Sequence, residues 1–268
     1  GILIYQLGTA QGGYQLELFD RKGTLVGKIA EPGDYNSATF SPDGKKIAFD
    51  LYDLRLRKRD VWLYDIARGI KNRFTFDPDM AAWPIWSPDG SRLLFHSPRR
   101  GGYDIFVKAS SGTENEKILL ESIQLKFAYD WSSDGKFIAY STLSTKKYDL
   151  WILPLEGDRE PFLFLQTEFE EDVPKFSPDM HWISYVSNES GKAELYVRPF
   201  LGADGKPVIN QTGKWQVSTN SLSPYSYNFY WWNRNGKEIF YYSSDNKLMA
   251  AEIKTSDSTL DIGAVRPL

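Results

Sequence analysis

Hydrophobic positions along this chain alternate with polar ones or gather in short blocks, and Gly, Pro, Asp or Ser bounds most blocks. Blocks such as Ile47-Ala48-Phe49 and Ile138-Ala139-Tyr140 are apolar and partly aromatic. Short bounded runs of this kind predict β-strands, and few stretches carry the competing apolar spacing of a helix. We therefore expect an all-β protein.

One stretch in the middle of the chain shows how the strands follow one another. Its first strand is Trp83–Trp86. The next residues, Ser87–Gly90, turn the chain, because Pro presets φ at the first corner and Gly accepts a positive φ at the end. Three further strands complete a four-stranded antiparallel unit: Arg92–His96, Asp104–Val107 and Lys117–Leu120.

The sequence motif of this turn, an aromatic residue followed by Ser-Pro-Asp-Gly or a close variant, recurs along the chain. Two of the copies match the motif only in part. The intervals between the fourth residues of the five copies are 46, 45, 45 and 56 residues. Self-similarity at this period is typical of a β-propeller with one repeat per blade. The five copies are Phe40–Gly44, Trp86–Gly90, Trp131–Gly135, Phe176–Met180 and Trp232–Gly236.

The residues before the first copy resemble the later part of a repeat, since Ile2–Tyr5, Leu16–Phe19 and Leu25–Ile29 fit second, third and fourth strands. We therefore expect one domain over residues 1–268, a six-bladed propeller with four-stranded antiparallel blades whose first blade lacks its inner strand. The expected blades cover residues 1–30, 36–77, 81–121, 126–166, 171–219 and 225–268.

The repeat block resembles the WD-like propeller repeats of the TolB type over essentially the whole chain. Segments of the second half look like the C-terminal propeller of bacterial membrane-anchored serine/threonine protein kinases, although Met180 and Ser221–Tyr227 depart from the glycines typical there. Both resemblances imply a sensor or interaction module on the extracytoplasmic side. The segments that carry the kinase likeness are Leu153–Asp158, Tyr185–Gly191, Tyr196–Phe200, Lys214–Ser218 and Gly236–Tyr241.

The bulk composition excludes several classes of partner. The net charge is −3, so the chain has no basic field to attract nucleic acid or an anionic membrane. It contains no cysteine, which rules out disulfides and thiolate metal sites. No window is apolar enough for a membrane helix. We expect neither nucleic acid nor direct membrane contact from this chain.

Two periodic sets of acids and one of aromatics are expected to be structural. The Asp of each turn is predicted to cap that turn by accepting hydrogen bonds from backbone N–H groups. The acid at the start of the third strand of each repeat is predicted to have a similar local structural role. The motif aromatics are predicted to pack between neighbouring blades. The turn acids are Asp43, Asp89, Asp134 and Asp179; the strand acids are Asp60, Asp104, Asp149 and Glu194; the aromatics are Phe40, Trp86, Trp131, Phe176 and Trp232.

Motifs of catalysis are missing from the sequence. The two histidines, His96 and His181, lie nearly two repeats apart along the chain, and no Gly-x-Ser-x-Gly elbow or Walker loop occurs. We expect a non-catalytic interaction or sensor propeller with no cofactor, such as the C-terminal domain of a signalling kinase. Two alternatives stay open: a periplasmic TolB-like adaptor, and the propeller domain of a peptidase or other hydrolase.

A binding site is expected where the loops that lead into the first strands of the blades converge at the mouth of a channel. That position suits a protein, a peptide or a small polar ligand. Two segments lie outside the repeat: Leu54–Arg59, a hairpin that carries four positive charges, and Tyr225–Trp232, an aromatic run that either packs or contacts a ligand. The candidate site residues are Tyr35, Asn36, Trp83, Lys126, Tyr129, Glu171, Asp172, Tyr227 and Asn228.

Overall fold

A computed structural model gives an all-β fold, which confirms the predicted class. The chain divides into two compact units, Gly1–Lys126 and Phe127–Leu268, called unit 1 and unit 2 here. Among the described residues there is no helix long and apolar enough to cross a membrane. The prediction of one domain over the whole chain stays a prediction. The structure describes residues 2–8, 13–99, 101–121, 124–144, 146–209, 213–222, 230–255 and 259–268.

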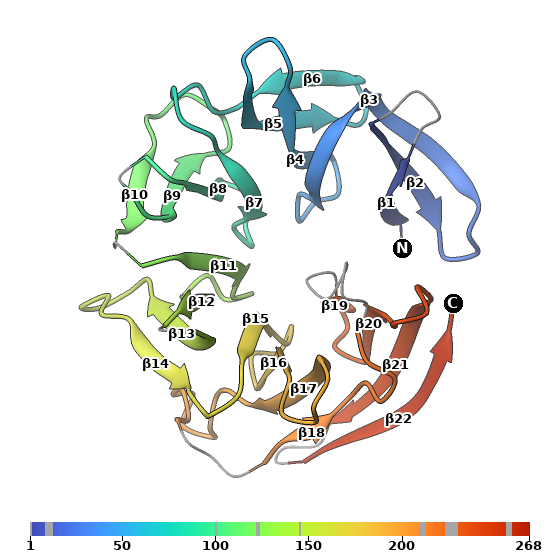
Figure 1. Cartoon of the computed structure of the whole chain (residues 1–268), viewed down its shortest axis with the longest axis vertical. Coiled ribbons are helices and arrows are strands. Elements are labelled where there is room, and N and C mark those ends of the chain that lie inside the picture. The colour runs from blue at the N-terminus through green and yellow to red at the C-terminus, as the bar shows by residue number, and fades with distance from the viewer. Residues whose placement is uncertain are drawn as a thin grey trace. The chain divides into compact units, whose positions relative to one another are not determined.

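Unit 1 holds two antiparallel sheets, one of six strands in the order β1 to β6 and one of four strands in the order β10-β9-β8-β7 (Figure 1). Strands that are neighbours in sequence are also neighbours in each sheet. The strands are β1 (Ile2–Gly8), β2 (Tyr14–Asp20), β3 (Leu25–Phe40), β4 (Lys46–Asp53), β5 (Lys58–Asp65), β6 (Ile70–Arg73), β7 (Ala82–Trp86), β8 (Arg92–Ser97), β9 (Asp104–Ala109) and β10 (Lys117–Leu120).

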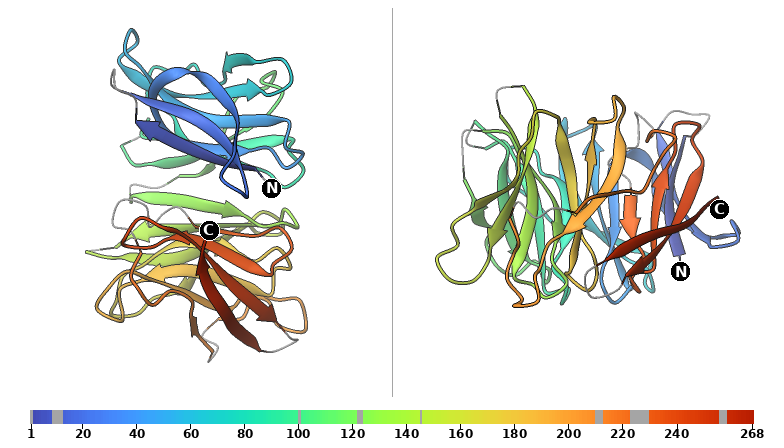
Figure 2. Two further views of the ribbon diagram at one scale, coloured as in Figure 1. Left: turned by 90° about the vertical axis from the view of Figure 1, so that its right-hand side faces the viewer. Right: turned by 90° about the horizontal axis from the view of Figure 1, so that it is seen from below.

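Unit 2 holds three sheets of four strands, each again in sequence order. The strands twist strongly within each sheet (Figure 2). They are β11 (Lys126–Trp131), β12 (Phe137–Leu143), β13 (Tyr148–Pro154) and β14 (Phe162–Leu165); β15 (Glu171–Phe176), β16 (Trp182–Ser187), β17 (Glu194–Pro199) and β18 (Trp215–Gln216); β19 (Tyr230–Trp232), β20 (Glu238–Tyr242), β21 (Leu248–Thr255) and β22 (Leu260–Pro267).

The six-blade prediction is wrong, because the described residues form five sheets. The predicted last strand of the first blade and first strand of the second are one continuous strand, β3, which pairs with β2 through its first half and β4 through its second. Ala30 has a positive φ and the β2–β3 register shifts between Tyr14 and Leu16, but the strand continues through this irregularity. At Gly33 a Cβ would lie 2.8 Å from Leu51 Cδ1, so the close approach requires glycine. The first two expected blades therefore merge.

The recurrent turns have the predicted caps. Ser91 N donates to Asp89 Oδ1 over 3.0 Å, and Gly90 takes the expected positive φ. Ser87 Oγ donates to Asp89 and accepts from Arg92 N, so the serine joins the turn acid to the start of the next strand. The sequence analysis missed this second role of the serine. Equivalent bonds occur at Asp43, Asp134 and Asp179.

Three of the motif aromatics pack between neighbouring sheets of the same unit, as predicted, whereas a fourth packs within the six-stranded sheet. The three are Trp86, Phe176 and Trp232, and the fourth is Phe40. Trp86 of β7 lies with Val61 of β5 in one core cluster, and its indole N–H donates to Thr39 O. Phe176 of β15 packs with Leu150 of β13. Large flat rings fill the space that the twist opens between adjacent sheets.

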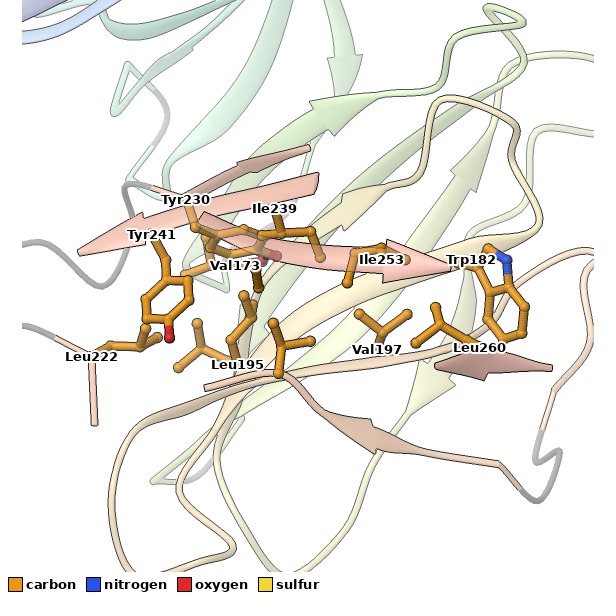
Figure 3. Packing of buried hydrophobic residues seen from close by; sticks show 13 residues of the cluster. Val173, Trp182, Leu195, Val197, Leu222, Tyr230, Ile239, Tyr241, Ile253 and Leu260 are labelled. Atoms are coloured by element: carbon orange, nitrogen blue, oxygen red, sulfur yellow. Dashed lines mark hydrogen bonds between the residues drawn. The ribbon is translucent and has the colours of Figure 1, made fainter. Parts of the chain in front are cut away.

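The largest core cluster of unit 2 fills the space between the sheets β15–β18 and β19–β22 (Figure 3). Leu195 and Val197 of β17 meet Ile239 of β20 and Ile253 of β21, and all four side chains are buried. Burial of each such side chain contributes ~1.5–3 kcal/mol. This core fixes β15, the strand that carries Glu171 and Asp172 of the candidate site.

Candidate binding site

The loop before β15 and the hairpin between β16 and β17 lie at the same end of unit 2. Glu170 N donates to Asn188 Oδ1 over 3.0 Å, and Asn188 N donates back to Glu170 O. The first strands β11, β15 and β19 lie on corresponding sides of their sheets (Figure 1). The two hydrogen bonds hold the beginning of β15 against the hairpin between β16 and β17, and β15 also contacts β12 and β13.

Asp172 lies at the centre of this region and is 5% exposed. Its carboxylate accepts a hydrogen bond from Val173 N over 2.8 Å, and the nearby hydroxyls of Ser141 and Tyr129 favour its charged form. Val173 has a positive φ, and the β15–β16 register shifts between Asp172 and Lys175. This bulge turns Asp172 inward, and burial raises its pKa to about 6 although the hydrogen bonds oppose the shift.

Two further buried carboxylates lie next to Asp172. Glu171 accepts a hydrogen bond from the Thr167 hydroxyl, and Asp149 Oδ2 accepts one from Gln166 Nε2 over 2.9 Å. Each acid keeps one buried oxygen, Glu171 Oε2 and Asp149 Oδ1, for which the described part of the chain supplies no hydrogen-bond donor. Lys147 Nζ lies 3.9 Å from Asp149 Oδ1, at the limit of an ion pair.

Burial raises the pKa of Glu171, and among the nearby charges Lys147 opposes the rise while Asp149 adds to it. The site therefore places two carboxylates near one lysine and has an acid surplus. Aromatic rings border it: burial and the charges of Asp172 and Glu170 raise the pKa of half-buried Tyr148. The ring of Phe127 lies 6.1 Å from that of Tyr148. We call Tyr129, Tyr148, Asp149, Glu170, Glu171 and Asp172 the acidic loop site.

A second polar group, not found by the sequence analysis, connects β11, β15 and β19. Asp130 Oδ2 accepts Phe176 N over 2.8 Å, and Lys175 Nζ lies 5.1 Å from the Tyr230 ring. Burial raises the pKa of Asp130 to about 6 and lowers that of Lys175 to about 8. Both residues directly precede a motif aromatic, which was the available sequence signal.

Of the candidate site residues, the structure brings together Tyr129, Glu171 and Asp172. Glu171 and Asp172 are adjacent in the chain, and Tyr129 reaches Asp172 through its hydroxyl. Tyr227 and Asn228 lie outside the described residues, as does most of the aromatic run Tyr225–Trp232.

The candidates in unit 1 have other surroundings. Tyr35 is a core residue that packs edge-on against Phe49 and donates to a backbone carbonyl. Next to it, Asn36 is exposed. Trp83 has a positive φ, and its ring lies 5.6 Å from that of buried His96. Tyr35 therefore supports the sheet.

The last unit 1 candidate, Lys126, is a buried cation at the start of β11. Burial lowers its pKa, while the charges of Asp104 and Glu121 oppose the shift. Lys126 is therefore a buried cation near two acids. Glu171 is instead a buried acid near one cation and one further acid.

The strand acids that were predicted to be structural are held locally in at least two sheets. Asp60 contacts Arg73 at 2.8 Å and Lys58 at 3.2 Å, and it accepts the Thr75 hydroxyl. Glu194 accepts a hydrogen bond from Ser221 N over 2.9 Å. Among the described residues no three His, Asp or Glu side chains are grouped so as to hold a metal ion.

Comparison with known proteins gives a family match and several curated relatives. Residues 17–226 match the family model described as the TolB beta propeller domain. An uncharacterised protein of Agrobacterium fabrum is 33% identical over 79 residues, which are 30% of this chain and 26% of that protein. The match thus spans about a quarter of the curated relative.

Solved structures similar to this chain include two TolB proteins. TolB from Acinetobacter baumannii has a TM-score of 0.75 at 19% identity, over 99% of this chain and 65% of its own. A putative TolB from Agrobacterium tumefaciens has a TM-score of 0.69 at 16% identity, over 92% and 87%. An oligogalacturonate lyase in complex with manganese reaches 0.66 at 14% identity, over 94% and 71%. At these identities the likeness shows the β-propeller fold alone.

Proposed function

The chain belongs to the TolB beta propeller domain family, and from this premise we propose that it is a non-catalytic propeller that binds a protein partner as an adaptor. The solved TolB structures favour this reading over the kinase-attached sensor of the sequence analysis. The resemblance to TolB-type propellers also leads us to propose an extracytoplasmic location.

The acid surplus of the acidic loop site is the observation that carries the proposal. Glu171 and Asp149 are buried, each keeps an oxygen for which the described residues supply no hydrogen-bond donor, and Lys147 lies near both. A buried carboxylate is stable when a cation or several donors complete it. A lysine or arginine side chain of a partner, placed beside the exposed Glu170 at the edge of this buried pair, would supply the missing positive charge.

The aromatic residues of the site favour the same kind of partner. The rings of Tyr129, Tyr148 and Phe127 are half-buried beside the carboxylates. Aromatic faces attract ammonium and guanidinium groups, and they offer large rigid contact area to a bound peptide. We therefore propose that the partner presents a basic segment with aromatic or apolar neighbours.

Titration with two matched synthetic peptides would test this function. The first is a dodecapeptide of repeated Gly-Arg-Ser-Tyr, and the second carries Glu in place of each Arg. We expect the arginine peptide to bind by calorimetry and the glutamate peptide to bind at least about tenfold more weakly, because like charges oppose it. Protonation of Asp172, whose pKa is about 6, should weaken binding as the pH falls from about 8 to 5.

Two variants separate the site from general electrostatics. Glu171→Gln removes a buried carboxylate of the site, and Glu168→Gln removes an exposed one from the same loop. We expect about a tenfold loss of arginine-peptide affinity for the first and less than about twofold for the second. Equal affinity of both variants for the peptide, with folded spectra, would contradict the proposed site.

A further inference from the structure

The hairpin between β4 and β5 carries a basic and apolar tip, Leu54–Arg57, that the proposed function does not use. Asp53 Oδ1 holds its shape by accepting Arg55 N over 2.8 Å and Leu56 N over 3.2 Å. Arg57 has a φ of +53°, a conformation that glycine or asparagine usually supplies. Loop geometry alone therefore does not account for an arginine at this position.

The base of the hairpin is fixed by ion pairs. Arg59 bridges Asp50 at 2.7 Å and Asp34 at 2.8 Å, while Lys58 lies 3.2 Å from Asp60. Two of the four positive charges predicted for this segment are thus neutralised within unit 1. The tip is mounted on a rigid base, which lowers the entropic cost of binding to it.

The remaining charges and the leucines of the tip face solvent. Leu54 is 83% exposed and Leu56 48% exposed. The guanidinium groups of Arg55 and Arg57 are exposed, and no ion pair joins them to another of the described residues. Two large apolar side chains in water beside two exposed arginines form a surface that a partner could cover.

A third exposed apolar residue lies in the loop that follows β6. Phe76 is 66% exposed, and the Arg73 guanidinium lies 5.2 Å from its ring centroid. Lys58 Nζ donates to Asp77 O and so ties this loop to the hairpin. The apolar and basic side chains therefore belong to one end of the six-stranded sheet.

We propose that the tip Leu54–Arg57, together with Phe76, binds an acidic peptide segment of a partner protein that also carries apolar side chains. Charge complementarity selects the acids, and the exposed Leu54, Leu56 and Phe76 select the apolar residues. A peptide fits better than an anionic membrane, because two arginines form a small patch on a chain with a net charge of −3. The proposal concerns unit 1 alone and does not depend on the acidic loop site.

Fluorescence anisotropy with a labelled dodecapeptide of repeated Glu-Leu-Asp-Phe would test the proposal. We expect the peptide to bind and its affinity to fall with added salt. Arg55→Ser/Arg57→Ser should lower the affinity by about fivefold to tenfold, because the variant removes two exposed ion pairs with the peptide. Leu54→Ser/Leu56→Ser should also weaken binding. The matched control is Lys45→Ser/Arg68→Ser, which removes two exposed cations from the same sheet and should leave binding unchanged.

Three results would overturn it. The first is no measurable binding of the acidic peptide to the wild-type chain. The second is equal loss in the control variant, which would mean that net charge rather than the tip attracts the peptide. The third is that the chain binds phosphatidylglycerol vesicles more tightly than the peptide, and that Arg55→Ser/Arg57→Ser abolishes this vesicle binding. That result would mean that the tip binds a membrane surface.

Discussion

Asp60 in unit 1 and Asp149 in unit 2 occupy the same place in the repeat but have opposite surroundings. Each is buried near the start of the third strand of its repeat, with a lysine two residues earlier. Asp60 has two cations, Lys58 at 3.2 Å and Arg73 at 2.8 Å. Asp149 has Lys147 at 3.9 Å and shares it with the carboxylate of Glu171.

The difference separates a structural acid from a candidate binding acid. At Asp60 the local charges are satisfied, so the side chain stabilises the sheet. At Asp149 and Glu171 two carboxylates share one nearby cation, Lys147, whose Nζ lies 3.9 Å from Asp149 Oδ1. A repeat position can thus serve the fold in one sheet and be free to bind in another.

The sharpest test of the comparison is to remove the two charges one at a time. Asp60→Asn should lower the free energy of unfolding by about 3 kcal/mol, because Arg73 and Lys58 lose their counter-charge in a part-buried position. Asp149→Asn should change it by less than about 1 kcal/mol, because it relieves like-charge repulsion with Glu171. Urea unfolding measures both values. An equal loss of unfolding free energy in the two variants would contradict the distinction between a structural Asp60 and a binding Asp149.

The pH dependence of stability gives a second test. The pKa of Asp172 is about 6 in the folded protein, above its usual range near 4, so the folded state binds more protons between these values. Stability should therefore fall as the pH rises from about 4 to 6, and Asp172→Asn should gain roughly 1–3 kcal/mol relative to wild type between about pH 4 and pH 8. Parallel unfolding free energies for the two proteins would contradict the raised pKa.

A turn acid that belongs to neither class provides a third test. Asp89→Ala removes the acceptor for Ser91 N and for the Ser87 hydroxyl, so we expect a loss of about 1 kcal/mol. Peptide binding should be unchanged. A loss of binding without a change in melting temperature would show that this turn takes part in recognition.

The repeat could be predicted from the sequence because each turn repeats the same residues, and the strands, their order within sheets and the turn caps follow from it. The merging of the first two blades could not, since Pro32-Gly33 has the composition of a loop. The structure instead keeps this segment within β3.

It was equally hard to predict from the sequence which side chains of the first strands point into the core. Their registers shift between Tyr35 and Ala38 and between Asp172 and Lys175. A bulge breaks the alternation by which inward and outward positions are counted. Tyr35 was therefore expected at a binding surface although it packs in the core, and Lys175 was not considered.

Amide chemical-shift mapping of the labelled protein with the Gly-Arg-Ser-Tyr peptide tests the central claim most directly, because it locates the bound peptide without a variant. The account predicts the largest shifts at Tyr129, Tyr148 and the segment 167–173, with little change at 54–60. The largest shifts on the outer strand β14, or at the hairpin tip Leu54–Arg57, would contradict the assignment of the acidic loop site as the place where a basic partner segment binds.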